Sequence, residues 1–182
     1  MFSKTHHTAV VVLPPAEVWE PIQAIRHRHD RQFHRWMPHI NLLYPFVPRA
    51  QWATALPLLT AAAQRIPAFQ ITLAVFRSFT HTSGNSTLWL DPEPSTSLIL
   101  LQAILQAAMP TCDEQSRFPG GFTPHLSVGQ ARSSQTLQRL LGALQATWQP
   151  VLFTVTAVAV IWRQGDSPFQ VGEWLPLAPA AD

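Results

Sequence analysis

The chain has 182 residues, of which 47% are apolar and only 12% are charged. This composition is typical of a compact globular protein with a real core, and it excludes an intrinsically disordered chain. A formal net charge of +2 is too small for a strongly basic nucleic-acid-binding surface, and a small anionic substrate fits it better.

The chain shows no sign of a membrane segment or of disulfides. Its longest early apolar run, from Ala9 to Leu13, ends at two prolines and is too short for a signal-peptide core or a bilayer span. The single cysteine, Cys112, excludes an internal disulfide and a cysteine-based zinc cluster. We expect a monomer in a reducing compartment, the cytoplasm or the nucleus, without membrane association.

The first half of the chain predicts a strand, a helix, a strand, a helix and two strands. β-Branched residues indicate the first strand, and Pro21 suits the start of the first helix. Pro57 lies inside the second helical segment, which predicts a kink or two short helices. The expected segments are strands at 8–13, 39–46, 69–79 and 87–90 and helices at 21–29 and 49–66.

The second half continues with two helices and three strands. Ser95 or Ser97 can cap the first of these helices, which reaches Ala108. The other expected segments are a loop at 111–121, a helix at 134–148, and strands at 125–128, 152–163 and 169–175. We expect a flexible tail over residues 176–182.

The two halves nearly repeat one another around a histidine. Pro38-His39-Ile40-Asn41-Leu42 lies 30 residues before a Phe-Gln-Ile-Thr strand, counted from histidine to phenylalanine. Pro124-His125-Leu126-Ser127-Val128 lies 28 residues before a Phe-Thr-Val-Thr strand. Together with the element order, this repeat predicts an α+β fold in one domain, residues 1–182, built of two equivalent lobes of antiparallel sheet and helices.

Each repeat places an imidazole beside a small polar side chain. Residues i and i+2 of a strand point to the same face, so His39 pairs with Asn41, and His125 pairs with Ser127. Two histidines can share the acid and base roles of phosphodiester cleavage near neutral pH, and Asn41 and Ser127 can donate hydrogen bonds to phosphate oxygens. Either motif alone is a weak signal, because most buried histidines only satisfy a hydrogen bond, but the recurrence favours function.

The segments from Pro38 to Phe46 and from Phe122 to Gln130 resemble the paired signatures of the two-histidine (2H) phosphoesterase superfamily. This group includes 2′-5′ RNA ligase-like proteins and RNA 2′,3′-cyclic phosphodiesterases. The resemblance covers the element order from Thr8 to Leu175. It implies a bilobed, pseudo-symmetric fold with helices outside, an active-site cleft between the lobes, and a cyclic nucleotide or an RNA end as substrate. It also implies that no metal or other cofactor takes part.

Within that resemblance, His125 would be the base that activates water and His39 the acid for the leaving oxygen, although the residues themselves leave this assignment open. The family pattern is His-x-Thr or His-x-Ser, and Asn41 departs from it in the first motif. Its amide can still donate to phosphate, so we expect the site to survive with an altered rate or ester preference.

Several further side chains are candidates for substrate binding. Arg77 and Arg163 hold matching places in the repeat, with surface ion pairing as an equal alternative. Arg132 follows the second motif, and Tyr44 follows the first, where core packing is favoured over a substrate role. Arginines also gather before the first motif, where they suit phosphate or a solvated helix face: Arg26, Arg28, Arg31 and Arg35.

Two other interpretations of the chain stay open at this point. A weakened site at Asn41 would suit a non-catalytic module that binds RNA or a nucleotide on the same scaffold. A purely structural protein would require the repeated histidine motif to be accidental. A metal site is not expected, because the sequence has no His-Glu-x-x-His or Cys-x-x-Cys pattern.

Overall fold

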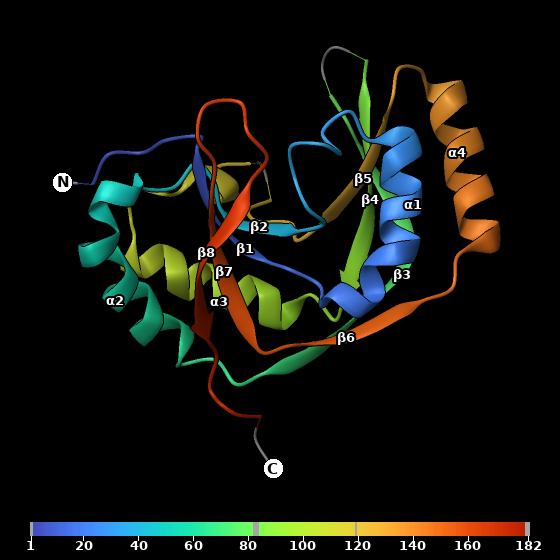
Figure 1. Ribbon diagram of the computed structural model, residues 1–182. Helices are drawn as coiled ribbons and strands as arrows, with labels where there is room; N and C mark the ends of the chain where they lie inside the picture. Colours follow the sequence, from blue (N-terminus) through green and yellow to red (C-terminus); the bar gives the residue numbers. More distant parts are fainter. Residues whose placement is uncertain (1, 82–83, 119, 181–182) are drawn as a thin grey trace.

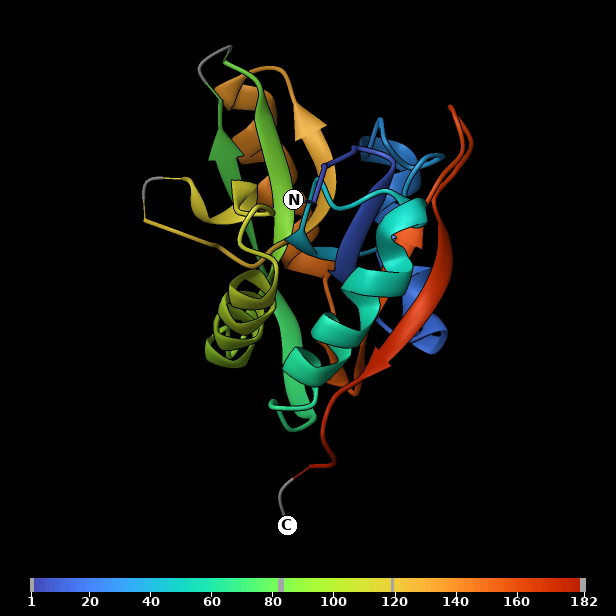
Figure 2. The same ribbon diagram turned by 90° about the vertical axis from the view of Figure 1, so that its left-hand side faces the viewer.

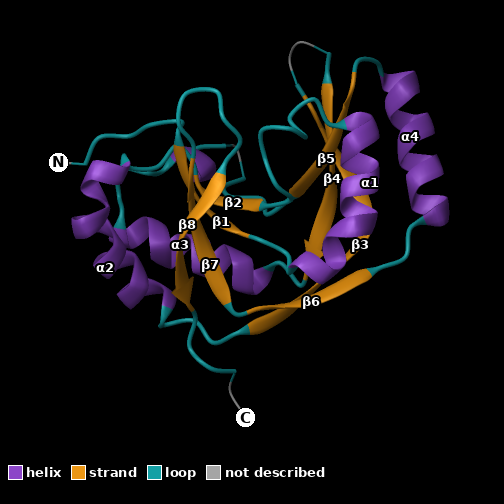
Figure 3. Cartoon of the chain, in the orientation of Figure 1, coloured by secondary structure: helices purple, strands orange, loops and turns teal. Residues whose placement is uncertain are grey.

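A computed structural model describes residues 2–81, 84–118 and 120–180. Over this part of the chain, a curled antiparallel sheet of eight strands carries four α-helices (Figures 1 and 3). The strands are β1 (Thr8–Val12), β2 (Ile40–Leu43), β3 (Phe69–Thr80), β4 (Ser86–Glu93), β5 (Leu126–Ala131), β6 (Val151–Val155), β7 (Ala157–Trp162) and β8 (Gln170–Pro176). The helices are α1 (Trp19–His29), α2 (Trp52–Ala63), α3 (Thr96–Ala108) and α4 (Ser134–Thr147).

The strands follow the order β6-β3-β4-β5-β2-β1-β7-β8, and all neighbouring pairs are antiparallel. The α+β class is therefore confirmed. The two four-stranded halves form one continuous sheet. They are joined between β2 and β5, where Ile40 pairs with Leu126.

The helices divide between the two halves of the sheet. Helix α1 packs on β5, and α4 packs on β3, β4 and β5. Helix α2 packs on α3 and β8, and α3 also packs on β2. Figure 2 views the molecule from the side on which α2 and α3 lie. Strand β1 belongs to the half formed by β2, β1, β7 and β8, but α1, which follows it in the chain, packs on β5 of the other half. The two halves are therefore interleaved in sequence.

Strand β1 has an apolar layer on each of its two faces. All five of its residues are buried, as its β-branched sequence suits a strand covered on both faces. Val10 and Val12 belong to the main core, whereas Ala9 and Val11 belong to a smaller cluster with Phe169. Trp36, Met37 and Tyr44 pack against this second cluster, which lies on the opposite face of the strand.

Some predicted boundaries were wrong. The expected long strand at 152–163 is two strands, β6 and β7, which pair in opposite halves of the sheet. They are separated at Thr156, whose carbonyl accepts a hydrogen bond from Leu177. Helix α2 is one helix that contains Pro57, not two short ones.

The start of the C-terminal tail contacts the rest of the fold. Pro176 is the last residue of β8, and Leu177 is buried. The amide of Ala178 donates to the carbonyl of Ile66 at 2.9 Å. Residues 181–182 lie outside the described part of the chain, and flexibility of the tail over residues 176–182 stays a prediction.

Candidate active site

The two histidine motifs meet at the centre of the sheet. Ile40 of β2 and Leu126 of β5 are cross-strand partners, and both are buried in the main core. His39 and His125 each come immediately before these strands. Alternation of side chains therefore turns the two histidines, with Asn41 and Ser127, to the opposite face of the sheet.

Both imidazoles are anchored in the same way. Nδ1 of His39 lies 2.7 Å from the carbonyl oxygen of Met37, and Nδ1 of His125 lies 2.8 Å from that of Thr123. A carbonyl can only accept, so Nδ1 is the protonated nitrogen in each ring. In the neutral form, Nε2 of each histidine then carries the lone pair that a general base requires.

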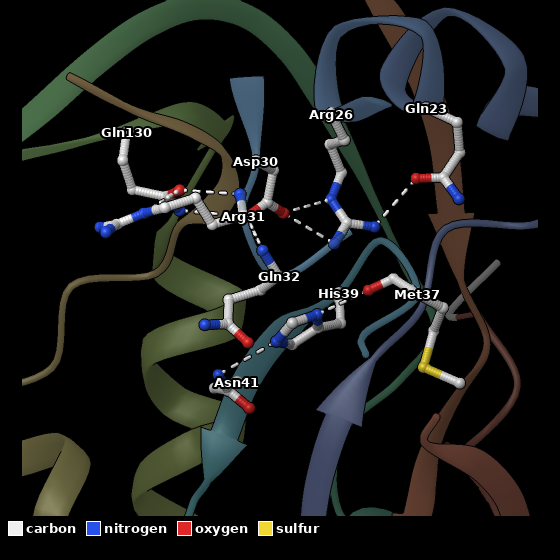
Figure 4. A network of polar contacts seen from close by, with 9 residues as sticks. All are labelled: Gln23, Arg26, Asp30, Arg31, Gln32, Met37, His39, Asn41 and Gln130. Carbon is white, nitrogen blue, oxygen red and sulfur yellow. Dashed lines mark hydrogen bonds and ion pairs between the residues drawn. The ribbon is translucent and has the colours of Figure 1, made fainter. Parts of the chain in front are cut away.

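His39 lies against an aromatic stack. Its ring is parallel to that of Trp36 at 4.5 Å, and Trp36 in turn stacks on Phe169 at 3.9 Å. Asn41 places its Nδ2 at 3.2 Å from Nε2 of the same imidazole (Figure 4). Packing and hydrogen bonds together therefore hold the ring in one orientation.

Burial makes His39 a weak base in the free protein. It lowers the pKa of His39 to about 4, and the positive charges of Arg26 and His125 act in the same direction. The hydrogen bond to Met37 and the carboxylate of Asp30 oppose this shift of the pKa. His39 is thus neutral near pH 7.

His125 has a similar environment on the other half of the sheet. Phe79 contacts its ring edge to face at 5.0 Å, and Trp89 lies at 5.9 Å. Burial lowers the pKa of His125, while the hydrogen bond to Thr123 works against this change. This imidazole is therefore also neutral near pH 7.

A cavity of about 610 Å³ opens beside His125. Asn41 and Ser127 line it, but His39 does not. The link between the cavity and His39 is Asn41, whose amide contacts the imidazole. Its other described lining residues are Phe79, Thr80, His81, Thr87, Gln115, Phe118, Gly121, Phe122 and Thr123. Among the described lining residues there is no Lys or Arg, so hydrogen-bond donors and aromatic rings dominate the cavity.

His81 and Phe118 are among the lining residues that the sequence analysis did not single out. His81 follows β3, and its Nε2 lies 2.9 Å from Oγ1 of Thr87. Phe118 is 65% exposed at the cavity. His81 lies between the expected strands at 69–79 and 87–90, and Phe118 lies in the expected loop at 111–121, where no pattern in the sequence distinguished them.

Arg26 has a different role from the one considered for it. It is only 1% exposed and forms an ion pair with Asp30 at 2.8 Å, so it is neither a phosphate ligand nor part of a solvated face (Figure 4). Asp30 also accepts hydrogen bonds from the Gln32 amide and from Gln130 of β5, at 2.9 and 3.0 Å. The chain that leads to His39 is thereby tied to the strand that follows His125.

None of the four residues predicted to bind substrate lines this cavity. Arg77 pairs with Asp91, and Arg163 pairs with Asp166 at 3.6 Å. Tyr44 packs edge to face against Trp36 at 5.2 Å. Arg132 is exposed. A substrate role for Arg77, Arg132, Arg163 or Tyr44 stays a prediction.

Searches of the described residues for two other kinds of site gave negative results. No described helix has the length and apolar character needed to cross a membrane. Within the same residues, no group of three or more His, Cys, Asp or Glu side chains is arranged to hold a metal ion.

Comparisons with known proteins agree with this fold. Among solved structures, E. coli LigT complexed with 3′-AMP matches with a TM-score of 0.61 and 20% identity, covering 94% of this chain and 98% of LigT. The protein TT0787 of Thermus thermophilus matches with a TM-score of 0.62 and 20% identity, covering 95% and 98% of the two chains. A search of curated proteins found no match. The family model for the 2′-5′ RNA ligase superfamily matches residues 14–167, and the chain therefore belongs to that superfamily.

Proposed function

We propose that this protein is a phosphodiesterase that cleaves a ribose cyclic phosphate or a 2′-5′ phosphodiester of a nucleotide or an RNA end. The observation that carries the proposal is the matched pair His39 and His125. Both are anchored through Nδ1, and both lie on one face of the sheet. His125 lines the cavity, and His39 contacts Asn41, which lines the same cavity.

The chemistry needs one proton acceptor and one proton donor. Nε2 of His125, which lines the cavity, takes a proton from water as the water oxygen forms a bond to phosphorus. The bond from phosphorus to a ribose oxygen then breaks, and His39 donates a proton to that oxygen. A phosphomonoester and a free hydroxyl result, and the two histidines exchange their protonation states.

His39 must carry a proton before it can act as the acid. Burial works against this in the free protein, where its pKa is about 4. A bound phosphodiester brings a negative charge close to the ring, which favours the imidazolium and raises the pKa. Substrate binding would therefore prepare the acid, and Ser127, with its hydroxyl at the cavity, would donate to a phosphoryl oxygen.

The contents of the cavity suit a short substrate. Phe79, Phe118 and Phe122 offer aromatic faces on which a base can stack. A related fold, that of E. coli LigT, has been crystallised with 3′-AMP, a ribose that carries a phosphate and a base. A cyclic nucleotide has the same parts with one negative charge.

A substrate panel tests this proposal. The purified protein is incubated with the four 2′,3′-cyclic nucleotides, with 2′-5′ oligoadenylate and with RNA that ends in a cyclic phosphate, and the products are identified by phosphorus NMR. We expect a phosphomonoester from at least one of them. Absence of any product from all of these substrates at high protein concentration would refute the proposed activity.

A binding module without turnover is the second candidate, and Asn41 favours it. Its amide donates to Nε2 of His39 and so occupies the atom that must exchange a proton. Calorimetric titration with the same panel separates the two functions. Nucleotide binding without any product would support the binding module, and product formation would exclude it.

A further inference from the structure

Asn41 occupies a special place between His39 and the cavity. Its Nδ2 lies 3.2 Å from Nε2 of His39 (Figure 4). Asn41 lines the cavity, whereas His39 does not. Of these two residues, only Asn41 can therefore contact a ligand in the cavity directly.

One polar atom of the Asn41–His39 pair lacks a hydrogen-bond partner among the described residues. Nδ1 of His39 donates to Met37, so the neutral ring accepts the Asn41 amide at Nε2. Oδ1 of Asn41 is buried, and no donor for it exists among the described residues. A buried acceptor without a partner is costly, and it indicates a second state in which the oxygen is used.

Protonation of His39 provides that second state. Nε2 then carries a hydrogen, and two donors would face each other unless the Asn41 amide turns by half a rotation. After the turn, Oδ1 accepts from Nε2, and Nδ2 occupies the position of the present oxygen. The bond from Nε2 to Oδ1 opens when His39 passes its proton to the leaving oxygen. The amide then offers a donor where the neutral state offers an acceptor.

A phosphate oxygen is an acceptor and can bond only to the turned amide. We propose that Asn41 is a positioning residue that couples protonation of His39 to the binding of a phosphate oxygen in the cavity. The inference rests on the proposed function in taking the ligand to be a phosphate ester. A Thr or Ser at this position could donate to phosphate in either state of His39, because its hydroxyl rotates freely, and the coupling would be weaker.

Charged groups around His39 do not replace this coupling. Arg26 of α1 and Asp30 after it act on the ring in opposite directions, and they are paired with each other. His125, before β5, acts against protonation of His39 when it is itself charged. Trp36, which covers the ring, is uncharged.

The test is an NMR titration of the His39 ring in the presence and absence of sodium sulfate. Sulfate is used because it mimics a phosphate group but does not titrate in this pH range. In the wild type, saturating sulfate should raise the pKa of His39 by about one unit or more, which by linkage is about a tenfold tighter binding of sulfate to the protonated form. In Asn41→Thr, the rise should fall to less than about half a unit, since only direct charge attraction remains.

Gln51→Ala is the matched control. It removes another amide whose oxygen is buried without a partner among the described residues, but Gln51 does not line the cavity, and the full shift should persist. An equal shift in the wild type and Asn41→Thr, or no shift in the wild type, would overturn the proposal.

A measurement on the wild type alone remains decisive if Asn41→Thr does not fold. The side-chain amide resonances of Asn41 should titrate with the pKa of His39, and amide signals that stay constant through this transition would also overturn the coupling. Both experiments measure equilibrium binding without turnover. They can therefore fail while the panel assay succeeds, or succeed while it fails.

Discussion

The buried ion pair between Arg26 and Asp30 supports the most quantitative prediction about stability. Asp30→Ala removes the only carboxylate that is paired with Arg26 in the described chain, and Arg26 is only 1% exposed. Breaking a buried pair costs about 3–5 kcal/mol, because the remaining charge stays in a poorly polar environment. The lost hydrogen bonds from Gln32 and Gln130 bring the expected total to about 4–6 kcal/mol.

Urea unfolding at neutral pH measures this change, with Asp166→Ala as the control. Asp166 is 97% exposed in its pair with Arg163, so its loss should cost less than about 1 kcal/mol. The double substitution Arg26→Met with Asp30→Leu should recover most of the stability, because a well-packed apolar pair can replace a buried ion pair. A cost below about 1 kcal/mol for Asp30→Ala would refute the reasoning, since Arg26 would then have another way to be solvated.

Three further predictions concern packing, pH and metals. Gly129→Ala should destabilise the fold by about 1–3 kcal/mol, because a Cβ there would lie 2.7 Å from Cβ of His29; Gly142→Ala, with open space around it, should show no such loss in the same urea assay. Stability should fall as the pH drops from about 6.5 to about 4, since the unfolded chain binds protons that the half-buried His39 and His125 do not bind in the folded protein; His39→Gln should show a smaller fall between these pH values, and an unchanged fall would contradict the lowered pKa of His39. Turnover on the substrate identified by the panel should survive dialysis against EDTA, and a loss restored by a divalent cation would contradict chemistry by two histidines alone.

The sequence predicted the candidate site better than its surroundings. The His39 and His125 motifs could be recognised in the sequence because each follows a proline and begins a short segment with the period-two alternation of a strand. Trp36 and Phe169 stack behind His39, but they come from separate loops, and no local pattern marks such a contact. The ion pair of Arg26 has a signal in the sequence, because Asp30 follows it by four residues, the spacing of an ion pair on one helix face.

The errors in the fold have physical causes as well. Strand-forming residues continue from Val151 to Trp162 without Gly or Pro, so nothing local marks the break at Thr156. The break arises from pairing with distant strands: β6 joins β3, and β7 joins β1. Pro57 fits within α2, where a strong helical pattern on both sides outweighs the hydrogen bond that proline cannot make.

The most direct test of the central claim compares turnover by the wild type with that of His39→Gln and His125→Gln on one confirmed cyclic phosphate. Each substitution should lower kcat by about 10²–10⁴ with the fold intact, because each removes a proton-transfer group. His34→Gln, which changes an exposed histidine away from the cavity lining, should leave kcat unchanged. Full turnover by either His39→Gln or His125→Gln would contradict the account.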